Sequence, residues 1–358
     1  MQKKTRVVAA MSGGVDSSVA AALLQQEGYE VIGITMCFNL PDAQSKKPRC
    51  CGLQGIEDAR RVAHKLGIKH YVLNMQKALE EKVIRDFCLQ YSRGLTPNPC
   101  VNCNQYIKFD ALLKKALALG AEYLATGHYA RVNIQERGYC LKKAKDSQKD
   151  QSYFLYRLTQ DKLKHILFPL GNYTKPQVRE LAKEFALPVA EKKESQEICF
   201  LPKDDYRFFL QERLPKAQIA LGPVVDKQGK ALGRHKGVAF YTIGQREGLG
   251  IAAGRPVYVV KIDAKKNLIT VGSKEEALSK EFLVKDLSFI GGSLKKKVAL
   301  EVKIRYNHPQ SPAEISPFGK KLKVKFKIPQ FAITPGQSAV FYAKDKVIGG
   351  GIIEEVLC

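Results

Sequence analysis

A short loop rich in glycine and serine constrains the fold more than any other feature of this sequence. The segment before it, Thr5–Ala10, is apolar and β-branched, which predicts a buried strand. The segment after it, Asp16–Gln26, is rich in Ala, Leu and Gln and is followed by Gly28, which predicts a helix with a glycine stop. We therefore expect a strand, a loop and a helix whose first N–H groups favour an anion.

The residues of the loop suit a phosphate ligand. Gly13 and Gly14 allow the backbone to turn tightly and to approach a ligand, and Ser12, Ser17 and Ser18 add hydroxyl donors. No Lys stands where the GxxxxGK[ST] pattern requires one, so the loop is not a P-loop. On these residues alone, an ordinary glycine-rich turn between a strand and a helix is the alternative.

Apolar strands alternate with helical segments through the first third of the chain. Strands are predicted at 5–10, 31–37, 69–73 and 123–126, and helices at 54–66, 76–91 and 106–119. This alternation predicts an α/β fold with a doubly wound parallel sheet. Ligands of such sheets bind beyond the carboxyl ends of the strands, so the loop after Ala10, Met36 and Gly127-His128 should converge.

The pattern changes after about Asp205, where glycines, prolines and β-branched runs predict short strands joined by turns. In Lys321–Ile328 lysines alternate with apolar residues, which predicts a strand with a cationic outer face in a barrel or sandwich. We expect three domains: residues 1–205 with the parallel sheet, a small central β-rich domain at 206–278, and a C-terminal β-barrel at 279–358.

Charge and hydropathy narrow the class of protein. The 358 residues carry a net charge of +24, which favours a polyanionic partner such as RNA, with solubility as the alternative. No apolar run approaches the roughly 20 residues of a membrane span. No signal peptide is recognisable after Met1, because a strand follows almost at once, and we expect a cytoplasmic protein.

Nine cysteines in a chain expected in the cytosol favour catalysis, metal binding or burial over structural disulfides. Cys100 and Cys103 have CxxC spacing in a loop stiffened by two prolines, which suits activated thiols, a disulfide or two metal ligands. A second CxxC is absent, which argues against a zinc ribbon. Cys199 lies in the polar loop 194–200, where an inert buried cysteine is the alternative. That inert role is the expected one for Cys37, Cys88, Cys140 and Cys358.

Five motifs in a fixed order together resemble the tRNA-specific 2-thiouridylases of the MnmA type, within the PP-loop ATP pyrophosphatase superfamily. They are SGGVDSS at 12–18, NPCVNCN at 98–104 followed by IKF, ATGHYAR at 125–131, KDQSYFL at 149–155 and SQEICF at 195–200. Weaker similarity continues through GVAFYTIGQREGLG at 237–250, Arg305-Tyr306 and TPGQSA at 334–339, so the resemblance covers essentially the whole chain.

The resemblance implies a fold, a reaction and a set of site residues. Residues 1–205 would form the PP-loop catalytic domain, which uses ATP and Mg²⁺ to adenylate O2 of uridine 34, the wobble base of a tRNA. Sulfur from a persulfide on Cys199 would then replace that oxygen, assisted by Cys103. The ATP-binding residues would be Ala10, Met11, Ser12, Gly13, Gly14, Val15, Asp16, Ser17, Met36 and Gly127.

The same resemblance implies the partners. The substrates would be tRNAs for lysine, glutamate and glutamine, and the sulfur donor would be a cysteine desulfurase or a relay protein. The target base would lie against Asn98, Pro99 and Cys100. Residues contacting tRNA would be His128, Lys149, Asp150, Gln151, Arg305, Tyr306 and Gln337. For His128 the alternative is a ring packed at the sheet edge, for 149–151 a solvated loop, and for Arg305-Tyr306 a surface strand.

One position departs from the pattern, because many members of this family have Asp where this chain has Cys100. Cys100, Cys103 and Cys199 together supply three thiolates, which is enough for a [4Fe–4S] cluster with an open fourth position. A cluster-dependent version of the same reaction is therefore an alternative. Two others are another PP-loop adenylating enzyme acting on tRNA, and a non-catalytic RNA-binding protein that keeps an ATP-binding fold.

Overall fold

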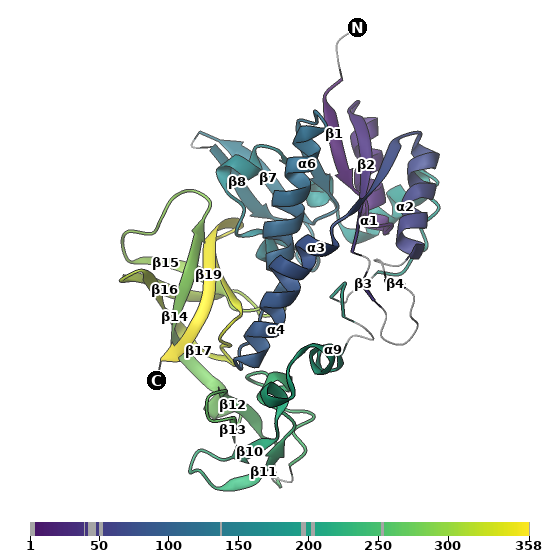
Figure 1. The fold of residues 1–358 in the computed structure, drawn as a ribbon. Helices are drawn as coiled ribbons and strands as arrows, with labels where there is room; N and C mark the ends of the chain where they lie inside the picture. Colours follow the sequence, from purple (N-terminus) through teal and green to yellow (C-terminus); the bar gives the residue numbers. More distant parts are fainter. Residues whose placement is uncertain are drawn as a thin grey trace. The chain divides into compact units, whose positions relative to one another are not determined.

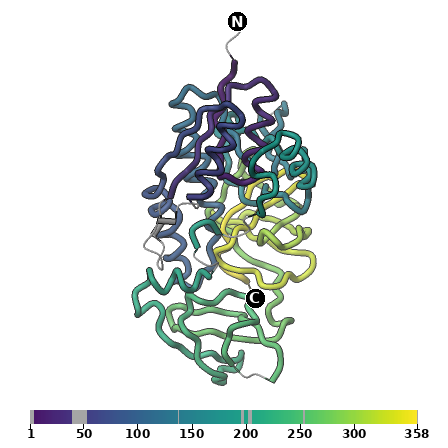
Figure 2. The backbone as a smooth tube through the Cα atoms, turned by 90° about the vertical axis from the view of Figure 1, so that its right-hand side faces the viewer, coloured from purple at the N-terminus to yellow at the C-terminus, as the bar shows by residue number. Residues whose placement is uncertain are grey.

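The computed structural model describes residues 4–38, 40–41, 48–49, 53–136, 138–194, 198–201, 205–251 and 254–357. The chain forms two compact units (Figures 1 and 2). Unit 1 comprises 1–83, 100–200 and 345–347, and unit 2 comprises 84–99, 201–344 and 348–358. Within the described ranges, no helix has the length and apolar character needed to cross a membrane.

A five-stranded parallel sheet forms the centre of unit 1. Its order is β5-β2-β1-β6-β9, from β1 (Arg6–Ala10), β2 (Glu30–Cys37), β5 (Lys69–Asn74), β6 (Tyr123–Thr126) and β9 (Ile166–Leu167). The predicted parallel α/β sheet is confirmed. The added strand, β9, has only two residues, which is too short to leave a pattern in the sequence.

Helices cover both faces of this sheet. The steps from β1 to β2 and from β2 to β5 run in one direction, and right-handed crossovers place α1 (Val15–Gln26) and α2 (Leu53–Leu66) on one face. The step from β5 to β6 runs the other way, which places the π-helix η2 (Cys103–Leu112) and α6 (Leu113–Ala118) on the opposite face. α8 (Lys175–Glu184) packs on α1.

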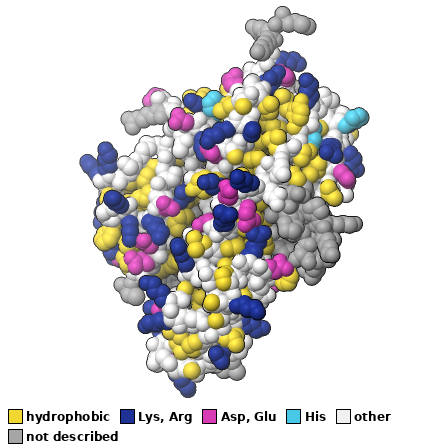
Figure 3. Space-filling view, viewed as in Figure 1, with side chains coloured by type: hydrophobic (Ala, Val, Ile, Leu, Met, Phe, Trp, Pro, Cys, Tyr) yellow, Lys and Arg dark blue, Asp and Glu magenta, His cyan; other side chains and the backbone are white. Residues whose placement is uncertain are grey.

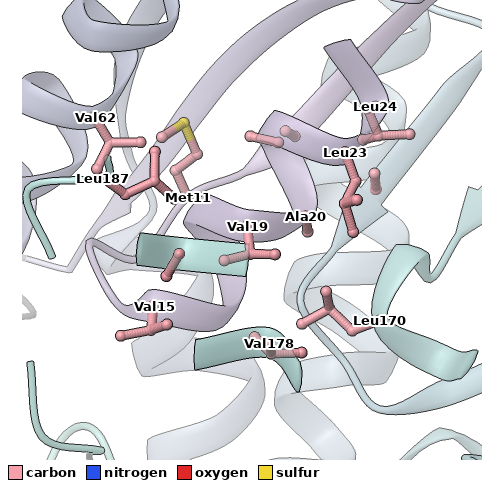
Figure 4. Packing of buried hydrophobic residues seen from close by; sticks show 14 of the residues in the cluster. Met11, Val15, Val19, Ala20, Leu23, Leu24, Val62, Leu170, Val178 and Leu187 are labelled. Carbon is pink, nitrogen blue, oxygen red and sulfur yellow. The ribbon is translucent and has the colours of Figure 1, made fainter. Parts of the chain in front are cut away.

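The core of unit 1 forms around α1, which is apolar on nearly all sides. Val19, Ala21 and Leu24 are almost fully buried, and Val178 of α8 and Leu170 pack in the same cluster (Figure 4). Burial of each valine or leucine side chain stabilises the fold by about 1.5–3 kcal/mol relative to its exposure to water. This packing fixes α1 against the sheet and α8, and with it the N-terminus that follows the loop.

The CxxC segment does not form the predicted loop. Pro99–Asn102 is a helix, α5, and it continues directly into η2. A proline is compatible with the first position of a helix because its φ is already helical and that position needs no N–H bond. The expectation of a loop was wrong for this reason. The remaining elements near unit 1 are α3 (Gln76–Leu79), η1 (Glu80–Ile84), β7 (Ala130–Gln135), β8 (Gly138–Lys143), η3 (Ser152–Leu155), α7 (Gln160–Leu163), η4 (Pro169–Asn172), β3 (Leu40–Pro41) and β4 (Pro48–Arg49).

Unit 2 contains two antiparallel-rich sheets, as the β-rich pattern predicted. The smaller has the order β11-β10-β13-β12, from β10 (Gly222–Val225), β11 (Ala231–His235), β12 (Tyr258–Asp263) and β13 (Leu268–Gly272). Helical elements of this unit are α4 (Arg85–Ser92), α9 (Tyr206–Arg213), η6 (Lys216–Ile219), η7 (Val238–Phe240) and η8 (Glu275–Ala277).

The larger sheet of unit 2 closes into a six-stranded barrel. Its order is β14-β17-β16-β15-β18-β19, and β14 pairs again with β19. Phe282, Val302, Ile315, Val324 and Phe341 fill its interior. The predicted C-terminal barrel is therefore confirmed. Its strands are β14 (Leu278–Phe289), β15 (Val298–Lys303), β16 (Ser311–Phe318), β17 (Lys321–Phe331), β18 (Ser338–Ala343) and β19 (Lys346–Leu357), of which 346–347 belong to unit 1.

Candidate active site

The loop after β1 leads directly into the N-terminus of α1. Gly14 is the N-cap residue and no side chain caps the helix. The Ser17 and Ser18 hydroxyls donate to the Gly14 carbonyl over 3.1 and 2.8 Å, and the Ser12 N–H donates to Ser17 Oγ over 3.1 Å. These bonds fix the shape of the loop, while the helix dipole favours negative charge at its open end.

Two glycines of this region are required by close backbone contacts. Gly13 has φ +72°, and a Cβ there would overlap the carbonyl group of Gly55. A Cβ on Gly127 would lie 2.8 Å from the Asp16 carbonyl carbon and from the Ser17 nitrogen. The segment after β6 therefore presses against the backbone at the start of α1.

The strand register brings the predicted ATP segments to one edge of the sheet. Ala10 pairs with Thr126 of β6 and with Ile34 of β2. Met36 lies two residues beyond Ile34, at the same end of β2. The predicted convergence of the three segments is confirmed, and Met11, at 2% exposure, is a core residue beneath the loop.

A chain of ion pairs surrounds the loop. Lys175 Nζ donates to Asp16 Oδ1 over 2.7 Å and to Glu194 Oε1 over 2.9 Å. Lys149 Nζ donates to the other oxygen of Glu194 over 2.7 Å. Tyr129 OH donates to Asp16 Oδ1 over 2.7 Å, and burial together with the Asp16 charge raises the pKa of Tyr129. The Lys175 side chain is only 9% exposed, so its charge acts in a poorly hydrated place.

A second lysine fixes the loop from another side. Lys192 Nζ donates to the Gly13 carbonyl over 2.9 Å and to Asp58 Oδ2 over 2.5 Å. Burial by itself would raise the pKa of Asp58, but hydrogen bonds from Lys192, Gln54 and Arg61 overcome it and lower that pKa to about 2. Asp58 is therefore an anion at neutral pH, and it holds Lys192 beside the loop.

Sequence reasoning missed these charged groups as site residues. Tyr129 and Glu194 lie inside or beside the quoted motifs, so their positions carried a signal. Lys175 and Asp58 lie on helices and Lys192 lies in a loop, all among many other charged residues, so only their partners distinguish them.

The three predicted thiols share one electrostatic neighbourhood. Cys100 and Cys103 are half-buried and Cys199 is exposed, and all three are thiols. Burial raises the pKa of Cys100 to about 11 and that of Cys103 to about 12. The charge of Cys199 contributes to both increases, and the Lys108 ammonium opposes them. Cys199 therefore lies close to both, although 96 residues separate it from Cys103 in the numbering.

His128 is packed rather than exposed, at 8% of its surface. Its Nδ1 lies 2.6 Å from Thr126 Oγ1 and its Nε2 lies 3.2 Å from Lys108 Nζ. The rings of Phe109 and Phe168 pack against it, with centroid separations of 5.8 and 5.9 Å. This arrangement matches the packed alternative considered for His128. Gly127 and His128 are consecutive, so one short segment contacts both the loop at α1 and the helix that carries Cys103.

Comparison with known proteins assigns each part of this chain to a protein family. Residues 5–203 match the model of the tRNA methyl transferase HUP domain, 207–273 that of the tRNA methyl transferase PRC-barrel domain and 279–353 that of the aminomethyltransferase beta-barrel domain. A tRNA-specific 2-thiouridylase MnmA of Pelotomaculum thermopropionicum is 53% identical over 98% of both chains. That of Clostridium acetobutylicum is 51% identical over 99% of this chain and 100% of its own. This chain belongs to the MnmA family.

Some solved structures resemble this MnmA family member at low sequence identity. The NMN synthetase of Francisella tularensis matches 61% of this chain and 81% of its own at 16% identity, with a TM-score of 0.34.

A metal cluster in this MnmA family member would need three thiolates directed at one point. Among the residues that the structure describes, which include Cys100, Cys103 and Cys199, no group of three His, Cys, Asp or Glu is arranged to hold a metal ion. The arrangement therefore does not fit the cluster, and we derive no step through one.

Cys37 is disulfide-bonded, so the expectation that it is an inert buried cysteine was wrong. Cys88 is half-buried and Cys140 buried, while Cys358 lies outside the described residues.

The predicted tRNA-binding tripeptide of this MnmA family member is engaged in internal contacts. Lys149 pairs with Glu194, as described above. Asp150 accepts hydrogen bonds from the N–H groups of Ala144 and Ser152, over 3.0 and 3.2 Å. Gln151 Oε1 accepts from the Tyr129 N–H over 3.0 Å. These bonds fix the segment 149–151, which in turn contacts Tyr129 through Gln151 and Glu194 through Lys149.

Within unit 2, two predicted tRNA contacts also have internal partners. Arg305 Nη2 donates to the carbonyls of Ile243 and Ala332 over 2.8 and 2.9 Å, beside a cavity of about 550 Å³. Gln337 Nε2 donates to the Thr96 and Pro97 carbonyls over 3.0 and 3.1 Å. The Lys303 ammonium lies 5.3 Å from the ring centroid of Tyr306, another predicted tRNA contact. Of the residues predicted to contact the target base, Asn98 is half-buried and Pro99 is buried.

The lysines of β17 do not make a wholly cationic surface, and acidic side chains lie among the basic ones on the face shown in Figure 3. Glu281 on β14 pairs with Lys323 and Lys325, each over 2.6 Å, and Glu354 on β19 pairs with Lys321. The alternation itself is as predicted from Leu322 to Phe326. Leu322, Val324 and Phe326 point inward and are buried. Ile328 is 71% exposed and breaks it. The prediction considered one strand, whereas the surface includes the acidic residues of its neighbours.

Proposed function

We propose that this protein is a tRNA-uridine 2-sulfurtransferase. It adenylates O2 of uridine 34 with ATP and replaces that oxygen with sulfur from a Cys199 persulfide, giving 2-thiouridine at the wobble position. The observation that supports the proposal is the segment Gly127-His128, since Gly127 packs on the backbone at the start of α1 and His128 contacts Lys108, whose charge acts on Cys100 and Cys103. The relatives that match over the full chain are named for this activity.

The first step requires groups that stabilise pyrophosphate as it leaves ATP. The uracil O2 attacks the α-phosphorus, and pyrophosphate leaves with the bridging electrons. The first N–H groups of α1, the Ser12 hydroxyl and the Lys175 ammonium, which already pairs with Asp16, would stabilise this negative charge. Ala10, Met36 and Gly127 lie at the same edge and would contact the adenosine.

Mg²⁺ would neutralise phosphate charge in this step. The donor set fits it, because Asp16 Oδ2 is not used in the bonds to Lys175 and Tyr129, and Mg²⁺ prefers carboxylate and phosphate oxygens. Asp16 is the residue that would hold the ion beside the phosphates.

The second step moves the sulfur. The terminal sulfur of the Cys199 persulfide attacks C2, and the C2–O2 bond breaks as AMP leaves with O2. The Cys103 thiolate then attacks Sγ of Cys199, and the S–S bond breaks with its electrons passing to the sulfur on C2. The products are 2-thiouridine and a Cys103–Cys199 disulfide, which an external dithiol must reduce before another turnover.

The tRNA would bind through both units. The target base would flip out of its stack and lie against Asn98, Pro99 and Cys100. Arg305 and Tyr306 pair a cation with a stacking ring, a combination suited to unpaired bases. Residues 1–205 would act as the catalytic domain, 206–278 as a central β-rich domain and 279–358 as a tRNA-contacting barrel. We infer tRNAs for lysine, glutamate and glutamine as substrates, and a cysteine desulfurase or relay protein as the sulfur source.

The test is mass spectrometry of tRNA nucleosides after reaction with ATP, Mg²⁺ and a persulfide source. We expect 2-thiouridine from the wild type and from Cys88→Ser, the matched control. Cys199→Ser should adenylate tRNA but accept no sulfur, and Cys103→Ser should carry the persulfide yet form no 2-thiouridine.

Cys100→Ser separates the two sulfur mechanisms. Near-wild-type activity of this variant supports the persulfide route. Loss of both the activity and the bound iron would instead support the cluster route. Wild-type thiolation by Cys199→Ser would overturn the proposed role of that residue. If pyrophosphate release never depends on tRNA, the proposed reaction itself is wrong.

A further inference from the structure

We propose that Lys108 is a positioning residue for sulfur transfer: its ammonium group, held in place by His128, stabilises the thiolate of Cys103. The proposal deepens the function proposed above and rests on it, because it explains how a thiol inside a packed helix becomes a nucleophile. It concerns a residue to which sequence reasoning assigned no role.

The helix that carries Cys103 has an unusual turn. Cys103–Leu112 is a π-helix, in which the backbone bonds join residues five apart. Lys108 is five residues after Cys103 and precedes the break in helical geometry at Phe109 (φ −99°, ψ 21°), so the wide turn brings the two residues towards the same side of the helix. In an α-helix of about 3.6 residues per turn, five residues would bring Lys108 most of the way to the opposite side. The wider turn therefore places the cation beside the thiol.

A buried acceptor fixes the ammonium group. Lys108 has no acceptor of its own, so it donates to Nε2 of His128 across the 3.2 Å that separate them. The ring proton is then on Nδ1, where it donates to Thr126 Oγ1 over 2.6 Å. Burial and the Lys108 charge hold the pKa of His128 well below its ordinary value. His128 is therefore neutral and acts as an acceptor, not as a second cation.

The charges around Cys103 show why this ammonium group matters. Burial raises the pKa of the Cys103 thiol to about 12, and the neighbouring Cys100 and Cys199 raise it as well. Lys108 is the cation that opposes them among the groups acting on Cys103 in the described part of the chain. The attack of Cys103 on Cys199 needs the thiolate, so the rate of that step should follow the strength of this interaction.

The experiment measures alkylation of Cys103 by iodoacetamide in the full-length protein, with peptide mass spectrometry as the readout. Below its pKa, the thiol reacts in proportion to its thiolate fraction. Lys108→Met should alkylate about tenfold more slowly than the wild type between about pH 7.5 and 9.5, which corresponds to about one pKa unit. Lys108→Arg keeps the charge and should stay within about threefold. Lys114→Met is the matched control, because Lys114 is a 74% exposed lysine of the adjoining helix α6.

A second readout separates positioning from folding. Lys108→Met should retain tRNA-dependent pyrophosphate release and persulfide loading of Cys199, and its slow formation of 2-thiouridine should recover as the pH rises. His128→Asn keeps Lys108 but removes its fixed acceptor, so it should slow alkylation in the same direction by about threefold. Alkylation of Lys108→Met at the wild-type rate would overturn the proposal, and so would equal slowing in Lys108→Arg. Alkylation does not depend on tRNA, so the proposed reaction can fail while this result stands.

Discussion

The ammonium group of Lys175 lies 2.7 Å from Asp16 Oδ1, and the same group lies 2.9 Å from Glu194. Asp16 belongs to the loop at α1, and Glu194 precedes Cys199 by five residues. One buried cation therefore joins the proposed phosphate site to the segment that carries the proposed persulfide. Phosphate oxygens would compete with Glu194 for this cation, which links nucleotide binding to the Cys199 segment.

Replacement of Lys175 tests its role at the phosphates. Lys175→Met should weaken ATP binding at least tenfold, because a charged hydrogen bond contributes about 1.5–3 kcal/mol. Lys183→Met is the control, since Lys183 lies on the same helix and is 63% exposed. Calorimetric titration with a non-hydrolysable ATP analogue gives the two affinities, and tRNA binding should stay unchanged in both variants. Equal affinity in the two would show that Lys175 is not a phosphate ligand.

Gly127→Ala tests the close approach at the start of α1. The added methyl group would meet backbone atoms of Asp16 and Ser17 at 2.8 Å, so the loop must shift. We expect a loss of about 1–3 kcal/mol in the free energy of unfolding and a marked loss of ATP binding. Gly291→Ala is the control, because no atom lies within 4 Å of the position of its Cβ. Urea unfolding followed by circular dichroism measures the stabilities, and a stable Gly127→Ala with normal ATP affinity would contradict the contact.

Acid should weaken the fold through Asp58. Its pKa is lowered to about 2 by Lys192, Gln54 and Arg61, against an ordinary value of 3.8. A group with a lowered folded pKa contributes stability above its unfolded pKa and loses it as the pH falls through the folded pKa. The free energy of unfolding of the wild type should therefore exceed that of Asp58→Asn by about 2 kcal/mol at about pH 6. In urea unfolding at several pH values, the difference should shrink as the pH falls from about 4 towards 2. A difference that does not vary with pH would mean that the Asp58 charge contributes nothing.

Salt dependence of tRNA binding tests the barrel surface. Lys327 is exposed, and no ion pair to it is found among the described residues. If tRNA phosphates meet this face, Lys327→Gln should lower the slope of log affinity against log salt by about 0.7–0.9. Glu281→Gln should tighten binding, because it releases Lys323 and Lys325 from their ion pairs. Filter binding between about 50 and about 300 mM salt measures both effects. Unchanged slope and affinity in the two variants would place the tRNA elsewhere.

Much of the fold was predictable because its signals are local. The apolar run at Thr5–Ala10, the glycines at 13 and 14 and the alternation in Lys321–Phe326 each depend on residues near one another in the chain. The CxxC segment shows the limit of such signals. Its prolines favoured a loop, yet Pro99 begins a helix, because a proline at the first helical position costs nothing.

The sequence by itself determined the order of the motifs and the glycine- and serine-rich composition of the loop after Ala10, and the family resemblance that these motifs carry indicated the candidate reactive thiols. Only the tertiary structure decided which charges meet. Lys175 is 159 residues from Asp16, and Lys192 is 134 residues from Asp58, so no local pattern could pair them. The position of Lys108 also depends on packing, because its acceptor His128 comes from another part of unit 1 and is itself packed against the rings of Phe109 and Phe168. Electrostatic energies depend on distance in space, and that distance exists only once the sheet has assembled.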